Sequence, residues 1–218
     1  MIDKKIHYCW FGGKPLPAMY ERCVDSWNAW LPDFEIVRWD ESNTAIDTPF
    51  LKSCYARKEW AFLSDYVRLR VVHSEGGIYL DADVEVIKNM EPLLDCEMFI
   101  GEESRGRATT GVFGAVKGHA FMRACMDFID ERHEAKRPYM IAPEVAMETL
   151  RTISKDGVRV LPPNYFYPYN PYDRESATKE LMFQDITPDT FAIHHWGKSW
   201  RQNIFSRIIK KVEKKLWK

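Results

Sequence analysis

Apolar and polar residues follow two different periods along the first part of the chain, and this pattern predicts strands separated by a helix. Short apolar runs at residues 5–11 and 35–39 indicate buried strands, because turn-forming residues follow each of them. Between these runs, residues 18–30 carry apolar side chains at helical spacing, and Pro32 ends the segment. A strand, a helix and a second strand in this order predict a βαβ unit within a parallel sheet.

The same reading continues to the other end of the chain. Residues 59–75 show helical periodicity that stops at Gly76 and Gly77, and the apolar strand 78–80 follows. Further strands are predicted at 84–86, 98–101, 112–116, 158–161 and 191–195, and further helices at 119–134 and 144–152. The fold class predicted from this order is α/β.

Composition indicates a packed domain of 218 residues. Hydrophobic residues make up 45% of the chain, and its 8 Trp, 10 Tyr and 12 Phe can fill a core and still line a site. No apolar run reaches the length of about 18 residues that a membrane span needs, and the first residues lack a signal-peptide pattern. The five cysteines have no CxxC spacing, so neither a disulfide framework nor a zinc finger is indicated, and the cytoplasm is the expected compartment.

Charge divides the chain into two units. Residues 201–218 hold seven basic residues and one acidic residue, a net charge of +6, whereas residues 1–200 carry −7. As a helix, the tail would place its apolar side chains on one face and most of its basic residues outside that face. Such a helix would bind an anionic membrane surface. A helix packed on the domain or in a dimer fits the pattern nearly as well.

Two carboxylates directly follow the predicted strand 78–80. Asp81 and Asp83 are two residues apart, so on an extended chain both side chains point to the same face. Mg²⁺ or Mn²⁺ held by one or two carboxylates keeps open positions for phosphate oxygens, which suits a diphosphate leaving group. The competing interpretation is an ordinary strand end with solvated acids, because Asp-x-Asp also occurs by chance.

Three more segments carry candidate site residues. Asp65 and Arg68 share one face of the predicted helix 59–75, where they form either a surface ion pair or a ligand-binding pair. Trp10, at the end of the first strand, is either a core residue or a platform for a flat base. The strand 191–195 leads into candidates for binding metal or phosphate, namely His194, His195, Gly197 and Lys198. Packing histidines with tryptophan anchors are the alternative there.

Taken together, these motifs resemble a known family. Residues 64–68 followed by 76–83 are similar to the signature of DXD-containing glycosyltransferases of the capsular polysaccharide and initiation-mannosyltransferase type, distantly similar to large clostridial glucosylating toxins. Residues 7–13 are similar to the N-terminal strand of that group, and residues 194–200 to its C-terminal motif. The matches occur in the family's order over roughly residues 4–200.

The resemblance implies a GT-A fold, which is a Rossmann-like single mixed, mostly parallel sheet flanked by helices. Residues 1–200 would form the catalytic domain and residues 201–218 a C-terminal amphipathic helix. The implied activity is a retaining hexosyltransferase that needs Mn²⁺ or Mg²⁺. It would move a sugar from a nucleotide sugar, with a UDP-sugar favoured, to a hydroxyl of a glycan or lipid-linked saccharide in polysaccharide synthesis. The expected place is the cytoplasm, including the inner face of the cell membrane.

The resemblance also assigns roles to individual positions. Asp83 would be the principal metal ligand, and Trp10 would stack on the nucleobase. The implied nucleotide-sugar ligands are Trp10, Tyr79, Asp81, Asp65, Arg68, Lys198 and Trp200. The candidate metal ligands are Asp83, Asp81, His194, His195 and Ser199, and the choice between the two histidines stays open. The implied catalytic residues are Asp65, Arg68 and Asp83. No second carboxylate for a covalent glycosyl intermediate is evident in the sequence.

Two other classes of protein fit parts of the pattern. A catalytically silent nucleotide- or carbohydrate-binding protein would keep the fold without turnover, but the complete set of Asp65, Arg68, Asp81 and Asp83 argues against loss of the site. A nucleic-acid-binding protein would use the basic tail. Against this, the body is acidic and the tail lacks an arginine-rich pattern interleaved with aromatic residues.

Overall fold

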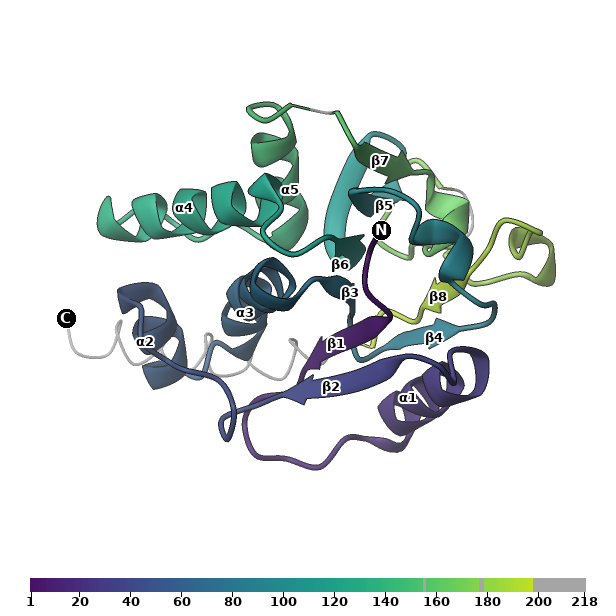
Figure 1. The fold of residues 1–218 in the computed structure, drawn as a ribbon, viewed down its shortest axis with the longest axis horizontal. Helices are drawn as coiled ribbons and strands as arrows, with labels where there is room; N and C mark the ends of the chain where they lie inside the picture. Colours follow the sequence, from purple (N-terminus) through teal and green to yellow (C-terminus); the bar gives the residue numbers. More distant parts are fainter. Residues whose placement is uncertain (155, 177–178, 198–218) are drawn as a thin grey trace, which may run out of the picture.

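A computed structural model describes residues 1–154, 156–176 and 179–197 (Figure 1). Within these residues, two sheets organise the chain. The six-stranded sheet has the order β2-β1-β3-β6-β5-β7, and β4 and β8 form a two-stranded ribbon. The strands are β1 (Lys5–Cys9), β2 (Glu35–Trp39), β3 (Gly77–Leu80), β4 (Val84–Val86), β5 (Met98–Ser104), β6 (Arg107–Ala115), β7 (Val158–Leu161) and β8 (Ala192–His194).

The larger sheet is mixed and mostly parallel, as predicted. β1 is parallel to β2 and β3, and β5 is parallel to β7, whereas β6 is antiparallel to β3 and β5. The helix α1 (Ala18–Trp30) connects β1 to β2, so the predicted βαβ unit is confirmed. The expectation of a single sheet was wrong. Because β1 and β6 occupy both edges of β3, the chain leaves the sheet after β3, and β4 pairs with β8 instead.

Helices and the small ribbon cover the two faces of the sheet. The helices α2 (Pro49–Ala56), α3 (Trp60–Glu75), α4 (Ala120–Glu134) and α5 (Ala142–Leu150) lie together on one side, and α1 and the β4–β8 ribbon lie on the other (Figure 1). The helix α2 was not predicted. Its signal is Thr48, whose side chain accepts a hydrogen bond from the Leu51 amide, followed by Pro49 at the first helical position.

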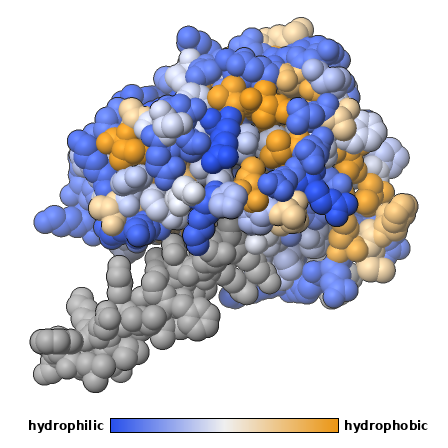
Figure 2. Space-filling model, turned by 90° about the horizontal axis from the view of Figure 1, so that it is seen from below, coloured by the Kyte–Doolittle hydropathy of each residue, from blue (hydrophilic) through white to orange (hydrophobic). Residues whose placement is uncertain are grey.

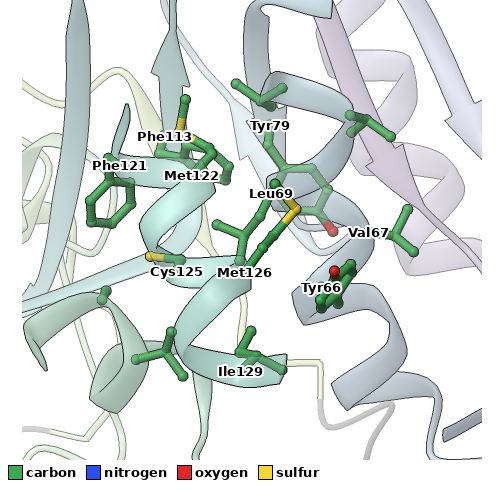
Figure 3. Close-up of a cluster of buried hydrophobic side chains, with 14 of the residues drawn as sticks. Tyr66, Val67, Leu69, Tyr79, Phe113, Phe121, Met122, Cys125, Met126 and Ile129 are labelled. Atoms are coloured by element: carbon green, nitrogen blue, oxygen red, sulfur yellow. The ribbon is translucent and has the colours of Figure 1, made fainter. Parts of the chain in front are cut away.

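Both faces of the strand β3 are buried, which explains its continuous apolar sequence. Tyr79 packs among the helices α2 to α5, and Figure 3 shows it with Phe113 and Leu69 in that cluster. Ile78 and Leu80 point the other way, into the cluster built around α1 and the ribbon. This double burial fixes the strand that leads directly into Asp81.

A turn that requires glycine connects α3 to β3. Gly77 has a φ of +97°, and a Cβ atom there would lie 2.7 Å from the Lys5 carbonyl oxygen. The backbone of β1 therefore lies so close to Gly77 that a side chain at this position would clash with it. His7 of β1 also reaches the turn, with Nε2 2.8 Å from the Gly76 carbonyl oxygen.

The outer surface is mixed in character. On the face shown in Figure 2, hydrophilic residues cover most of the described surface and hydrophobic residues form separate groups. Such a surface is ordinary for a globular domain. Among the described residues, no helix combines the length and the apolar character that crossing a bilayer requires. The tail 201–218, predicted as a helix, lies outside the described residues.

Candidate active site

A buried arginine joins α3 to the end of β3. Arg68 is 6% exposed, and its Nη2 atom lies 3.0 Å from Asp65 Oδ1 and 2.9 Å from Asp81 Oδ1. Its Nη1 atom donates to the Thr110 carbonyl oxygen at 2.8 Å, and the guanidinium lies 4.7 Å from the centre of the Tyr79 ring. The guanidinium is thus paired on several sides, as a buried cation must be. The structure brings together Asp65, Arg68, Tyr79 and Asp81, as the sequence predicted.

The two carboxylates beside Arg68 differ in their pKa values. Burial raises the pKa of Asp65 to about 6, against the opposing effect of Arg68. Burial acts in the same direction on Asp81, but Arg68 and His194 outweigh it and hold the pKa of Asp81 below its ordinary value. Asp81 is therefore the carboxylate of this pair that stays ionised over a wider range of pH.

A second cluster shares Asp81. Ligand atoms of Asp81, Asp83 and His194 all lie within 4.8 Å of one another. The His194 Nε2 atom is 3.6 Å from Asp81 Oδ2 and 3.5 Å from Asp83 Oδ1. The β4–β8 ribbon produces this proximity, because its register places His194 opposite Val84, one residue after Asp83.

The cluster favours a positive charge between its members. Burial lowers the pKa of His194, but the carboxylates of Asp83 and Asp81 outweigh this effect and raise it. Two carboxylates and one imidazole are a donor set that fits a divalent cation such as Mn²⁺, since carboxylates suit Mn²⁺ and Mg²⁺ and imidazole suits the transition metals.

Backbone contacts around the cluster fix Asp83 and His194. Asp83 Oδ2 accepts a hydrogen bond from the Gly197 amide at 2.7 Å. The Trp196 amide lies 3.2 Å from His194 Nδ1. A metal bound to Nε2 would leave the ring proton on Nδ1. That atom could then no longer accept a hydrogen bond from the Trp196 amide.

The structure separates the two candidate histidines. His195 does not contact Asp81 or Asp83 through its side chain. Its Nε2 atom instead lies 2.7 Å from Glu85 Oε2. Neighbouring residues on an extended chain point to opposite faces, so only one of them can join Asp81 and Asp83. His194 is that residue. Lys198, Ser199 and Trp200 lie outside the described residues.

A cleft of about 1200 Å³ is lined by residues of both clusters, whereas Asp65 lies behind Arg68 and lines a neighbouring pocket. Arg68, Asp81, Asp83 and His194 line the cleft, and so does Trp10, whose ring centroid is 5.1 Å from that of Tyr20 and whose indole nitrogen donates to the Lys14 carbonyl oxygen. Lining residues that the sequence did not single out include Tyr55, Lys58, Trp60, Glu103, Thr109, Gly111, Tyr167, Tyr172 and Trp196.

Glu103 is a cleft residue that the sequence did not single out. It places a further carboxylate on the wall of the cleft, with a side chain that is 15% exposed and an Oε1 atom 2.6 Å from Arg107 Nε. Burial raises the pKa of Glu103 despite this arginine. The hairpin β5–β6 brings Glu103 to the cleft, and no local sequence pattern identifies it.

Comparison with known proteins identifies the family. Residues 17–100, which include Asp81 and Asp83, match a family described as a glycosyltransferase sugar-binding region containing a DXD motif. The chain is 30% identical over 154 residues to lactosylceramide 4-alpha-galactosyltransferase of Pongo pygmaeus, covering 62% of this chain and 67% of that protein. The chain belongs to this family of DXD-containing glycosyltransferases.

Two further comparisons extend the picture. Inositol phosphoceramide mannosyltransferase 3 of Schizosaccharomyces pombe is 32% identical over 130 residues, which are 56% of this chain and 35% of that protein. The chain spans roughly half to two thirds of the length of the lactosylceramide galactosyltransferases that it matches. In fold, it is similar to galactosyltransferase LgtC solved with donor and acceptor sugar analogues, with a TM-score of 0.51, 17% identity and coverage of 89% of this chain and 88% of that one. The predicted GT-A fold is confirmed.

Proposed function

We propose that the chain is a retaining, divalent-metal-dependent glycosyltransferase that moves a hexosyl group from a nucleotide sugar to a hydroxyl group. The donor that we favour is a UDP-sugar, and the acceptor is a glycan or a lipid-linked saccharide. The observation that carries the proposal is that Asp81, Asp83 and His194 meet in one cleft beside the buried Arg68. Membership of the glycosyltransferase family supports the reaction class.

Charge neutralisation is the first task of the site. Mn²⁺ or Mg²⁺ held by Asp81, Asp83 and His194 would stabilise the negative charge of the departing nucleoside diphosphate. The Gly197 amide holds Asp83, and Arg68 holds Asp81, so these carboxylates are oriented before substrate binds. Such preorganisation lowers the cost of reaching the transition state.

Positioning of the donor is the second task. Asp65 and Arg68 would bind hydroxyl groups of the transferred sugar, and Trp10, with its indole on the cleft wall, would stack on the base. The new bond would form between the acceptor oxygen and the anomeric carbon as the bond to the diphosphate breaks on the same face. The acceptor proton would pass to the departing diphosphate oxygen. The enzyme would then act by orientation and electrostatics more than by a nucleophile.

The acceptor that we favour carries a lipid. The names of both relatives described above contain a ceramide lipid, and one name specifies an alpha linkage, which retention from an α-linked donor would produce. We place the reaction in the synthesis of a polysaccharide or glycolipid, in the cytoplasm or on the inner face of the cell membrane. The basic segment 201–218 would bind the anionic lipid there.

A donor screen tests the proposed activity. The purified chain is incubated with a panel of nucleotide sugars, with Mn²⁺ or with a chelator, and released nucleoside diphosphate is measured. We expect Mn²⁺-dependent release from one donor class, and an anomeric configuration in the product, read by NMR, that matches the donor. Tight binding without release would favour the catalytically silent alternative. Failure of every nucleotide sugar to bind would contradict the proposed function and leave a carbohydrate-binding protein as the alternative.

Liposome sedimentation tests the membrane assignment separately. The full chain and a chain ending at residue 202 are mixed with vesicles that contain anionic lipid. We expect only the full chain to sediment with the vesicles, and to do so less at high salt. Equal sedimentation of both chains would exclude the segment as the anchor.

A further inference from the structure

A buried hydroxyl group without a partner lies in the cleft. Tyr167 is 3% exposed, and within the described parts of the chain its hydroxyl oxygen has no hydrogen-bond partner. Burying a hydroxyl group unpaired is unfavourable, and buried polar groups in native structures nearly always find a partner in protein, water or ligand. The proposed roles of Asp81, Asp83 and His194 do not account for Tyr167.

The tyrosine ring is held rigidly. Its backbone amide donates to the Pro163 carbonyl oxygen at 2.7 Å in the turn after β7. Its ring centroid lies 5.3 Å from that of His194 and 5.9 Å from that of Trp196. Since His194 belongs to the candidate metal cluster, the Tyr167 ring is fixed against the centre of the site. Rotation of the hydroxyl hydrogen is the freedom that remains for meeting a ligand.

The hydroxyl oxygen lies beside Asp81. A Cβ atom at Gly111 would be 2.7 Å from the Tyr167 hydroxyl oxygen and 2.8 Å from Asp81 Oδ2. Both oxygens therefore approach the same backbone position of β6, and the missing side chain of Gly111 leaves room for both. Because Gly111 and Tyr167 line the cleft with Asp81, a substrate bound at the cluster would pass close to the hydroxyl group.

A tyrosine hydroxyl group is protonated at neutral pH, because its ordinary pKa is about 10. The phenol is therefore a hydrogen-bond donor at neutral pH. In a cleft crowded with carboxylates, it is a neutral donor that an electron-rich substrate oxygen can use without displacing an ion pair.

We propose that Tyr167 is a further substrate-binding residue, whose hydroxyl group donates a hydrogen bond to an oxygen atom of the sugar diphosphate of the donor. The inference rests on the proposed function, because it requires a nucleotide sugar in the cleft. The accepting oxygen belongs either to the diphosphate or to the transferred sugar. Both offer the same acceptor chemistry, and the experiment separates them.

The test compares Tyr167→Phe with Tyr165→Phe. Tyr165 belongs to the same segment, but its ring stacks on Phe191 at 5.7 Å and it is not among the residues that line the cleft. Four quantities are measured for wild type and both variants with Mn²⁺ present. They are the melting temperature, the affinity for the nucleoside diphosphate, the affinity for the intact nucleotide sugar, and the KM for the acceptor.

We expect Tyr167→Phe to weaken binding of the nucleotide sugar by about tenfold, the effect of one lost hydrogen bond. The melting temperature should stay equal or rise, because an unpaired buried hydroxyl group is removed. Equal weakening of nucleoside diphosphate binding would assign the bond to the diphosphate, and unchanged nucleoside diphosphate binding would assign it to the sugar. Tyr165→Phe should bind both ligands as wild type does.

Three results would overturn the inference. They are wild-type affinity for the nucleotide sugar in Tyr167→Phe, a loss confined to the acceptor KM, and a loss of donor affinity that appears equally in Tyr165→Phe. If wild-type protein binds nucleotide sugars and Tyr167→Phe binds them equally well, the inference about Tyr167 fails and the proposed function stands. If wild-type protein binds none, both fail together.

Discussion

Arg68 Nη2 lies 2.9 Å from Asp81 Oδ1, so a single buried ion pair connects helix α3 to the end of strand β3. The same nitrogen atom lies 3.0 Å from Asp65 Oδ1. Asp65, which would bind the donor sugar, and Asp81, which would bind the metal, are thus both paired with the guanidinium group of Arg68. Stability and activity are coupled at this point.

Substitution of Arg68 should damage both the fold and the site. Arg68→Met leaves the Asp65 and Asp81 carboxylates without their common partner and should lower the free energy of unfolding by about 3–5 kcal/mol. Arg68→Lys keeps the charge but not the planar fork, so it should cost less than Arg68→Met while still weakening donor binding. Urea unfolding measures both variants. Equal stability of Arg68→Met and wild type would show that the ion pair is not structural.

The two neighbouring histidines should behave differently toward metal. His194→Ala removes the imidazole that lies 3.5 Å from Asp83, and should weaken Mn²⁺ binding by about tenfold or more. His195→Ala is the matched control, because His195 pairs with Glu85 and should leave the affinity nearly unchanged. Titration with Mn²⁺, followed by calorimetry or electron paramagnetic resonance, gives both affinities. A larger loss in His195→Ala would reverse the assignment.

Stability should fall in mild acid because of His7. Its Nδ1 atom accepts a hydrogen bond from Trp39 Nε1 at 3.1 Å, so its Nε2 atom donates to the Gly76 carbonyl oxygen and the ring is neutral. Burial lowers the pKa of His7 from the ordinary value of 6.5. Below pH 6.5 the unfolded chain therefore binds more protons than the folded one, and stability falls as the pH decreases toward the pKa of the folded state.

The variant His7→Gln isolates this contribution. The free energy of unfolding is measured for wild type and variant above and below the ordinary pKa of histidine, at about pH 7.5 and about pH 5.5. Wild type should lose more stability between the two values than His7→Gln does. Identical losses would mean that another group causes the pH dependence.

Gly77 should tolerate alanine less well than Gly13. Both have positive φ angles, so each substitution costs about 1–2 kcal/mol for conformation. At Gly13 a Cβ atom would meet nothing within 4 Å, whereas at Gly77 it would lie 2.7 Å from the Lys5 carbonyl oxygen. Gly77→Ala should therefore be clearly less stable than Gly13→Ala in urea unfolding. Equal stabilities would mean that β1 moves aside at little cost.

Local signals explain what could be predicted from the sequence. The helix 59–75, the Gly76–Gly77 stop and the strand before Asp81 are contiguous in sequence, and their periodicity identifies them. Arg68 could be tied to the site because a charge on the buried face of a helix needs a partner.

Long-range pairing explains what could not be predicted. The separate ribbon exists because β4 meets β8 across more than a hundred residues, and the register of that pairing alone selects His194 over His195. Glu103 and Tyr167 reach the cleft from the β5–β6 hairpin and from the segment after β7. Nothing in their neighbouring residues marks them as ligands.

Asp83→Asn gives the most direct test of the central claim that the Asp81, Asp83 and His194 cluster binds the cation of a glycosyltransferase. Asparagine keeps the size of the side chain but removes a negative charge from the cluster. Release of nucleoside diphosphate from the preferred nucleotide sugar is measured with Mn²⁺ for wild type and variant, alongside their melting temperatures without metal. We predict that Mn²⁺-dependent turnover disappears while the variant stays folded. Turnover near the wild-type level in a folded Asp83→Asn variant would contradict the account.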